Sequence, residues 1–247
     1  MLTYAIVCPL VCLAGLIDSI AGGGGLISLP AFLLAGLPAH NAIATNKLSS
    51  TIGTTVSTAR FAKNGYMKLK LILPCIVFSL IGSVTGANLS LLVSDALLKK
   101  VMLVVLPIVA LTVFLERKND LPEDGVPITP RIYVISMIAA LIIGIYDGFY
   151  GPGTGSFLLL IFTSIAKTDV HTATGTTKAL NLTSNVAALF TFILHKQEVY
   201  PLGLTAGLFC LAGHYIGSGM VTKNGMKVVR PVILIVLVLL FLKIIFE

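Results

Sequence analysis

Four ionisable residues lie inside long apolar stretches of the sequence: Asp18, Lys47, Asp147 and Lys178. A charge at the centre of a membrane helix costs about 2.5–3.5 kcal/mol on insertion scales, so each of them needs a partner or water. Such residues commonly mark a path for ions or substrates. The structural alternative is that Asp18 pairs with Lys47 and Asp147 with Lys178, which would lock helices together. Both interpretations hold at once if the aspartates pair while the lysines also face a ligand.

A glycine-rich run follows each aspartate, GGGG at 22–25 and GPGTG at 151–155. Glycine weakens a helix and Pro152 lacks a backbone donor, so both runs predict helix breaks. Irregular backbone at membrane depth must be buried in protein or line a watery cavity. A short helix starting after each break would point its N–H groups and positive dipole end inward, where they can bind an anion. The glycines predicted to contribute are Gly22, Gly24, Gly25, Gly151, Gly153 and Gly155; the alternative is that they serve close helix packing.

Uncharged polar residues surround both lysines, in ATNKLSSTIGTT (44–55) and GTTKALNLTSN (175–185). The best placed to contact a ligand directly precede the lysines: Thr45, Asn46, Thr176 and Thr177. Lysines, backbone N–H groups and hydroxyls with few free acids predict a site for an oxyanion. No ring of carboxylates or carbonyl-rich loop favours a metal cation, and no cofactor is expected. His214, inside a hydrophobic stretch, is expected to be a hydrogen-bonded core residue.

The composition indicates what must hold these residues in place. The chain has 247 residues, of which 56% are hydrophobic and 11% charged, and its mean hydropathy is +1.00. This profile is typical of an all-α, multi-pass membrane protein. The polar stretch 116–131 reads as a linker between two membrane repeats, 1–115 and 132–247. Ten hydrophobic segments are predicted, at 2–21, 26–37, 42–60, 71–93, 97–115, 132–150, 156–166, 172–194, 201–221 and 230–246.

Two of these segments, 26–37 and 156–166, are short. At about 1.5 Å per residue they reach only about 16–18 Å, less than the hydrocarbon core of about 30 Å. We expect half-helices or tilted helices near the middle of the membrane, and the sequence leaves open whether they span it or are re-entrant.

The second half of the sequence repeats the first. GLIDSIAGGG (15–24) aligns with GIYDGFYGPG (144–153), and HNAIATNK (40–47) aligns with HTATGTTK (171–178). The register of the second match also superposes the GxxxG of Gly82 and Gly86 on that of Gly213 and Gly217, which we interpret as helix-packing motifs. Because each repeat has five segments, an odd number, the second should be inverted in the membrane.

The Lys and Arg residues support this inversion. With the N-terminus outside, eleven of them face the cytoplasm and four the outer side, as the positive-inside rule requires. Both termini are therefore predicted to be extracytoplasmic and the linker cytoplasmic. Because the basic residues mark segment ends and form no patch, the net charge of +7 does not indicate nucleic-acid binding. The cytoplasmic set is Arg60, Lys63, Lys68, Lys70, Arg117, Lys118, Arg131, Lys167, Lys223, Lys227 and Arg230, and the outer set is Lys99, Lys100, Lys196 and Lys243.

The motifs GLIDSIAGGGGLISLPAFLLAGLPAHNAIATNK, GIYDGFYGPGTGS and ATGTTKALNLTSN resemble the sulfite exporter TauE/SafE family over essentially the whole chain. The resemblance implies a permease for sulfite, a sulfonate or a related sulfur anion. The residues alone lead only to an anion permease.

We therefore predict a secondary transporter of a small sulfur-containing oxyanion in the cytoplasmic membrane, working by alternating access and coupled to an ion or a proton. Lys47 and Lys178 would attract the anion, while Asp18 and Asp147 would position the lysines and could carry protons. The partners expected are the anion and the lipid bilayer, and a homo-oligomer is possible. An anion channel with the same site is one alternative. The other is an intramembrane aspartyl protease using Asp18 and Asp147, but the lysines would hold those acids ionised, so no enzyme is expected.

Overall fold

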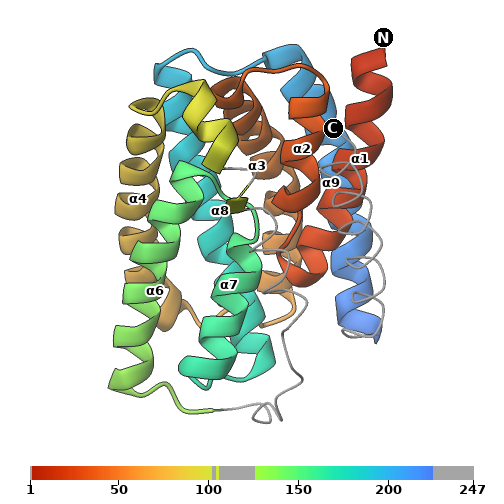
Figure 1. The fold of residues 1–247 in the computed structure, drawn as a ribbon. Coiled ribbons are helices and arrows are strands. Elements are labelled where there is room, and N and C mark those ends of the chain that lie inside the picture. The colour runs from red at the N-terminus through yellow and green to blue at the C-terminus, as the bar shows by residue number, and fades with distance from the viewer. Residues whose placement is uncertain (1, 102–103, 106–125, 225–247) are drawn as a thin grey trace.

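The computed structural model describes residues 2–101, 104–105 and 126–224. All regular secondary structure in these ranges is helical (Figure 1). Most of the predicted segment 97–115, most of the linker and the predicted segment 230–246 lie outside the described residues. The described helices match the remaining predicted segments.

The first half contains α1 (Leu2–Ala21), α2 (Gly25–Leu34), α3 (Ala39–Lys63) and α4 (Leu69–Leu91). The second half contains α6 (Pro130–Phe149), α7 (Thr154–Leu160), a π-helical turn η1 (Ile161–Ile165), α8 (Val170–Leu194) and α9 (Tyr200–Asn224). Two starts have side-chain caps. Thr129 accepts a hydrogen bond from the backbone N–H of Ile132, with Pro130 at the first turn of α6, and Asp169 accepts one from that of Thr172 at the start of α8.

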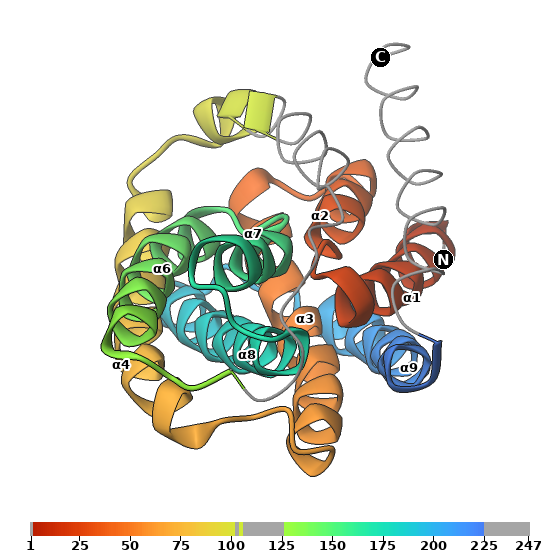
Figure 2. The ribbon, with the colours of Figure 1, turned by 90° about the horizontal axis from the view of Figure 1, so that it is seen from below.

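The most extensive helix contacts join the two halves, because α4 packs on α6 and α1 packs on α9. Seen from below, α3 and α8 lie between these two pairs (Figure 2). The predicted GxxxG packing is confirmed. A Cβ at Gly82 or Gly86 would collide with the backbone of α6, and one at Gly213 or Gly217 with the backbone of α1. Small residues thus allow the helix backbones to approach closely.

The connections between helices gather at two opposite ends. At one end the α3–α4 and α7–α8 connections meet, where Lys68 Nζ lies 3.4 Å from Asp169 Oδ2 and the ring of Tyr66 lies 4.3 Å from that of His171. At the other end Asn41 Nδ2 donates to the carbonyl of Gln197 at 2.6 Å. Because α3 runs from the second end to the first and α8 runs back, the two helices are antiparallel (Figure 1).

Three of the described helices are long and apolar enough to cross a membrane: Thr3–Ile20, Leu69–Leu91 and Pro130–Phe149. The helices α3, α8 and α9 each have 25 residues, about 37 Å in length. They are more polar, and on α3 and α8 the lysines and most of the hydroxyls and amides around them are buried. Large apolar side chains are exposed instead on the outer faces, as on α4 at Leu73, Val77 and Ile81. The polar residues therefore face the interior of the helix bundle.

Candidate functional site

The two glycine-rich runs meet in the centre of the molecule. The first separates α1 from α2 and has Gly22 at φ 79°, and the second separates α6 from α7 and has Gly151 at φ 101°. A Cβ on Gly155 would lie 2.5 Å from the Cα of Gly22, and one on Gly25 would lie 2.9 Å from the Cα of Pro152. The junctions after the two aspartates therefore pack against each other, backbone to backbone, and leave no space for side chains.

The carboxylate of Asp147 sits in a tight set of short contacts. Lys47 Nζ lies 2.8 Å from its Oδ2. Thr154 Oγ1 donates to Oδ1 at 2.7 Å, and Ser184 Oγ donates to Oδ2 at 2.6 Å. Lys47 Nζ also donates to Asn185 Oδ1 at 3.0 Å. Both charged side chains are 2% exposed, so this pair is enclosed and its hydrogen-bonding groups are occupied.

The carboxylate of Asp18 is held more loosely. Lys178 Nζ donates to the backbone carbonyl of Asp18 and lies 3.3 Å from its Oδ2. Asn181 Nδ2 donates to Oδ2 at 3.3 Å, and the backbone N–H of Gly24 donates to Oδ1 at 3.2 Å. His214 Nε2 lies 3.6 Å from Oδ2. The Asp18 side chain is 13% exposed, so this pair has longer contacts and more open surroundings than the other.

The predicted pairing is wrong, because each aspartate pairs with the lysine of the opposite half. Lys47 binds Asp147, and Lys178 binds Asp18. The reason is that α3 and α8 pack against each other in the centre, with Thr58 on α3 donating to the carbonyl of Lys178 at 3.2 Å. Each lysine thereby reaches the aspartate of the other half. Two acids and two bases thus form two ion pairs that tie the halves together.

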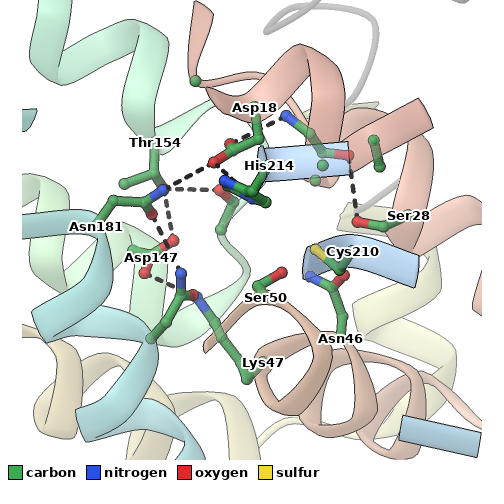
Figure 3. A pocket seen from close by; sticks show the side chains of 17 residues that line it. Asp18, Ser28, Asn46, Lys47, Ser50, Asp147, Thr154, Asn181, Cys210 and His214 are labelled. Carbon is green, nitrogen blue, oxygen red and sulfur yellow. Dashed lines mark hydrogen bonds and ion pairs between the residues drawn. The ribbon is translucent and has the colours of Figure 1, made fainter. Parts of the chain in front are cut away.

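A small cavity of about 30 Å³ lies between Asp18 and the Lys47–Asp147 pair (Figure 3). At about 10–15 Å³ for each water, it has room for roughly two waters. Of the predicted site residues, eight line it: Asp18, Gly22, Gly24, Gly25, Asn46, Lys47, Asp147 and Gly151.

The other predicted residues are not in the cavity lining. Lys178 is turned to Asp18, and Thr45 accepts a hydrogen bond from the backbone N–H of Val199 at 3.1 Å. The hydroxyls of Thr176 and Thr177 are buried without a hydrogen-bond partner among the described residues. Gly153 and Gly155 belong to the junction itself. The structure therefore brings most of the first-half site residues to the cavity and few of the second-half ones.

The helix starts at the junctions are less free than we expected. The carboxylate of Asp18 receives the N–H of Gly24, and the N–H of Thr154 at the start of α7 donates to the carbonyl of Gly151 at 3.2 Å. An anion that approaches the first turn of α2 must therefore compete with a carboxylate of the protein itself.

Sequence reasoning missed several residues of the cavity. Asn181 and Asn185 follow Lys178 by three and seven positions, so they share its helix face, and this spacing was a usable signal. His214 is buried as predicted, at 1% exposure, and its Nδ1 lies 3.0 Å from Ser57 Oγ, which confirms the hydrogen bond. It also lines the cavity beside Asp18, which the sequence did not indicate.

Asp169, directly before the start of α8, has a shifted pKa. Burial raises the pKa of Asp169, but the hydrogen bonds from the backbone and hydroxyl of Thr172 and the charge of Lys68 outweigh it and hold the pKa below its ordinary value. The contact of Lys68 with Asp169 therefore joins the two connections at neutral pH.

The sequence was also compared with known proteins. The sequence model of the family described as sulfite exporter TauE/SafE matches residues 7–244. The chain is 37% identical over 231 residues to the "Probable membrane transporter protein ORF9" of Sinorhizobium sp, covering 94% of this chain and 88% of that protein. It is 35% identical over 237 residues to the "Probable membrane transporter protein YfcA" of Escherichia coli strain K12, covering 95% and 87%. A "Probable membrane transporter protein" of Haemophilus influenzae is 30% identical over 235 residues, covering 95% and 91%. No solved structure matches.

Proposed function

This chain belongs to the sulfite exporter TauE/SafE family, and from that premise we propose that it is a secondary transporter that moves a small sulfur-containing oxyanion by alternating access. The observation that carries the proposal is the pair of buried Asp–Lys contacts, each made between the halves, with a polar cavity beside them. Charged residues at membrane depth are expensive and mark substrate or ion pathways.

The anion binds by exchanging partners with the protein. In the described conformation each lysine is neutralised by a carboxylate, so the four charges balance. An oxyanion that enters the cavity replaces a carboxylate as the partner of Lys47 or Lys178. Asn46, Asn181 and the backbone N–H groups near Gly24 then supply further hydrogen bonds. Alternating access then requires the two halves to move relative to each other.

The relation between the halves fits an inverted repeat. The antiparallel course of α3 and α8, and the matching contacts of α1 with α9 and of α6 with α4, support it. The short helices α2 and α7 then lie at mid-membrane as half-helices after glycine breaks. With the positive-inside bias, the termini are extracytoplasmic and the chain sits in the cytoplasmic membrane.

This orientation has a matched pair of test positions. Asn64→Cys in the α3–α4 turn should react with a membrane-impermeant maleimide only from the cytoplasmic side, and His195→Cys at the end of α8 only from outside. The two positions correspond in the repeat alignment that superposes Lys47 on Lys178. Labelling of both from the same side contradicts the inverted repeat.

The relatives are named as probable membrane transporters, which argues against the aspartyl protease. In addition, each aspartate is bound to a lysine of the other half, whereas such a protease needs two acids that share a proton. An anion channel with the same site differs in its kinetics, because a carrier shows saturable flux and exchange of labelled for unlabelled anion.

The test is a flux screen in proteoliposomes with labelled sulfite, sulfate, thiosulfate and small sulfonates. The parent protein should take up at least one sulfur anion with saturation and exchange. In the fraction that elutes as a folded species, Lys47→Ala and Lys178→Ala should abolish this flux, while Lys63→Ala, an exposed position at the end of α3, should not change it. Absence of flux for every anion in the parent rejects the sulfur substrate, and unchanged flux in both lysine variants of the ion pairs rejects the site.

A further inference from the structure

The imidazole of His214 lies deep in the molecule on α9, directly beside the looser ion pair (Figure 3). Its Nδ1 is 3.0 Å from Ser57 Oγ of α3, and its Nε2 is 3.6 Å from Asp18 Oδ2 of α1. Both Asp18 and His214 line the cavity. A histidine whose Nε2 faces a carboxylate and whose ring borders a polar cavity is well placed to take up a proton.

This arrangement belongs to one half only. In the repeat alignment, the position that corresponds to His214 is Ser83 on α4. The hydroxyl of Ser83 donates to the backbone carbonyl of Ser184 at 2.6 Å and so serves helix packing. Asp147 is held instead by Lys47 and the hydroxyls of Thr154 and Ser184. The two aspartates therefore match in sequence position but differ in whether a titratable ring lies beside them.

His214 and Lys178 face the same oxygen atom. Lys178 Nζ lies 3.3 Å and His214 Nε2 lies 3.6 Å from Asp18 Oδ2. Ser57 Oγ donates to the carbonyl of Thr54 at 3.1 Å, so it can accept from Nδ1–H of a neutral ring. In that tautomer Nε2 carries no hydrogen and leaves this oxygen to the lysine. When a proton binds the ring, both ring nitrogens donate, and the imidazolium competes with Lys178 for Asp18. The proton thus weakens the hold of Asp18 on Lys178 and releases the ammonium group for another anion.

The groups around the imidazole of His214 come from α9 itself and from α1, α3 and α8. The charges that act on it are Asp18 from α1 and Lys178 from α8. On its own helix Cys210 lines the same cavity, while Cys12 of α1 places its backbone carbonyl against Gly213. Arg60 of α3 lies one step away, donating to Ser218 Oγ at 3.0 Å, and Ser218 Oγ donates to the carbonyl of His214 at 2.6 Å. No other acid than Asp18 forms an ion pair with His214 among the described residues.

We propose that His214 carries the proton that is coupled to anion transport, and that proton and anion cross the membrane together. The proposal rests on the proposed anion transport and adds the residue, the partner ion and the relative direction. Protonation of His214 gives the Asp18–Lys178–His214 group one net positive charge, which one bound monoanion neutralises. Asp147 with Lys47 then stays paired and carries no proton.

The experiment separates exchange from proton-driven uptake. Parent and variants are reconstituted in liposomes whose membrane potential is held at zero with potassium and valinomycin. The probes are labelled sulfite, thiosulfate and methanesulfonate, with protein-free liposomes as background. With the outside more acidic by one pH unit, the parent should accumulate the anion inside up to about tenfold, the ratio that one proton per anion supports.

His214→Asn keeps an amide near Nδ1, and His214→Gln keeps one near Nε2, but neither side chain titrates. His214→Gln, whose amide can donate to Asp18 Oδ2 without taking up a proton, should retain exchange of labelled for unlabelled anion at a reduced rate, and His214→Asn should exchange more slowly still. Both should lose accumulation, with a ratio of inside to outside anion near one. His195→Asn, at the exposed end of α8, is the matched control and should accumulate like the parent.

Each outcome decides the proposal. Accumulation that persists in the His214 variants, or accumulation toward the acidic side in the parent, overturns it while leaving anion transport intact. Failure of both variants to insert and elute as a folded species assigns His214 to the scaffold and also overturns it. If the parent moves none of the three anions, the proposed function itself fails and the coupling proposal falls with it.

Discussion

The two Asp–Lys pairs are made from the same residue types at corresponding positions, yet the protein surrounds them differently. Around Asp147 the contacts are 2.6–2.8 Å and come from a lysine and two hydroxyls. Around Asp18 they are 3.2–3.6 Å and come from a lysine, an amide, a backbone N–H and an imidazole. The charged residues are the same in both pairs, so the difference comes from their neighbours. The neighbours of Asp147 make a tight ion pair that holds the two halves together, and those of Asp18 leave a weaker pair that can change partners.

The largest effect should follow from Asp147→Asn. This change leaves the ammonium group of Lys47 buried at 2% exposure without its counter-charge, and breaking one side of a buried pair costs about 3–5 kcal/mol. We expect a strong loss of folded protein in fluorescence size-exclusion and thermal aggregation assays. The double change Asp147→Asn with Lys47→Met, which removes both charges, should recover much of it. If Asp147→Asn alone melts like the parent, the pair does not fasten the halves.

The second-largest effect should follow from a substitution of Gly24, in the junction beside Asp18. A Cβ at Gly24 would lie 2.6 Å from both the carbonyl oxygen of Ala14 and the Cβ of Asp18, whereas one at Gly23 meets only ordinary contacts at 3.6 and 3.7 Å. Gly24→Leu should therefore displace Asp18 and abolish anion binding, measured by scintillation proximity with labelled sulfite. Gly23→Ala is the neighbouring control and should bind like the parent. Normal transport by Gly24→Leu would show that the glycines of this junction serve helix packing and do not contribute to anion binding.

Asp18→Asn should have a smaller effect on folding than Asp147→Asn. Lys178 keeps its hydrogen bond to the backbone carbonyl of residue 18, and the amide keeps part of the side-chain bonding, so we expect a loss of about 1–3 kcal/mol. The site also becomes more positive, so anion binding should persist or tighten while turnover slows and loses its dependence on the pH gradient. Binding and flux measured on the same preparation test this. Equal destabilisation by the two Asp→Asn changes would remove the contrast between the pairs.

The smallest effect concerns Asp169, which lies at a helix end away from both pairs. The pKa of Asp169 is lowered in the folded protein. The stability that its ionised form contributes is therefore present above the ordinary pKa of about 3.9 and is lost as the pH falls through the lowered pKa. Asp169→Asn retains the cap of α8 and should cost less than about 1 kcal/mol at pH 7. Melting curves between pH 7 and pH 3 should show less acid destabilisation for the variant than for the parent. An equal or greater loss in acid would contradict the assigned pKa direction.

The sequence predicted the helices, the packing glycines and the charged residues of the centre well. These features depend on local rules: apolar length, glycine runs and the cost of charge in lipid, all of which are visible in one stretch of sequence. The pairing of Asp18 with Lys178 depends on how α3 and α8 cross, which no single stretch specifies. The approach of Gly22 to Gly155, which lies in the other half of the chain, has the same origin.

The position of His214 in the cavity lining was missed for a different reason. A lone histidine in an apolar helix is ordinary as a core residue, and it is one here. Only the position of Asp18 on the neighbouring helix α1 makes the ring part of the cavity. In the repeat alignment the counterpart of His214 is Ser83, so the histidine is present in one repeat only. This asymmetry was the signal in the sequence that His214 differs from a shared packing residue.

The exchange of ion-pair partners between the halves has a consequence for synthesis of the protein. The ribosome delivers Asp18 and Lys47 to the membrane before the second half exists, and their final partners, Lys178 and Asp147, are still untranslated. The first half therefore has to hold an acid and a base at membrane depth through a waiting period, paired provisionally with each other or with water. Only completion of the second half supplies the native partners. A chain arrested after residue 115 therefore lacks both final partners.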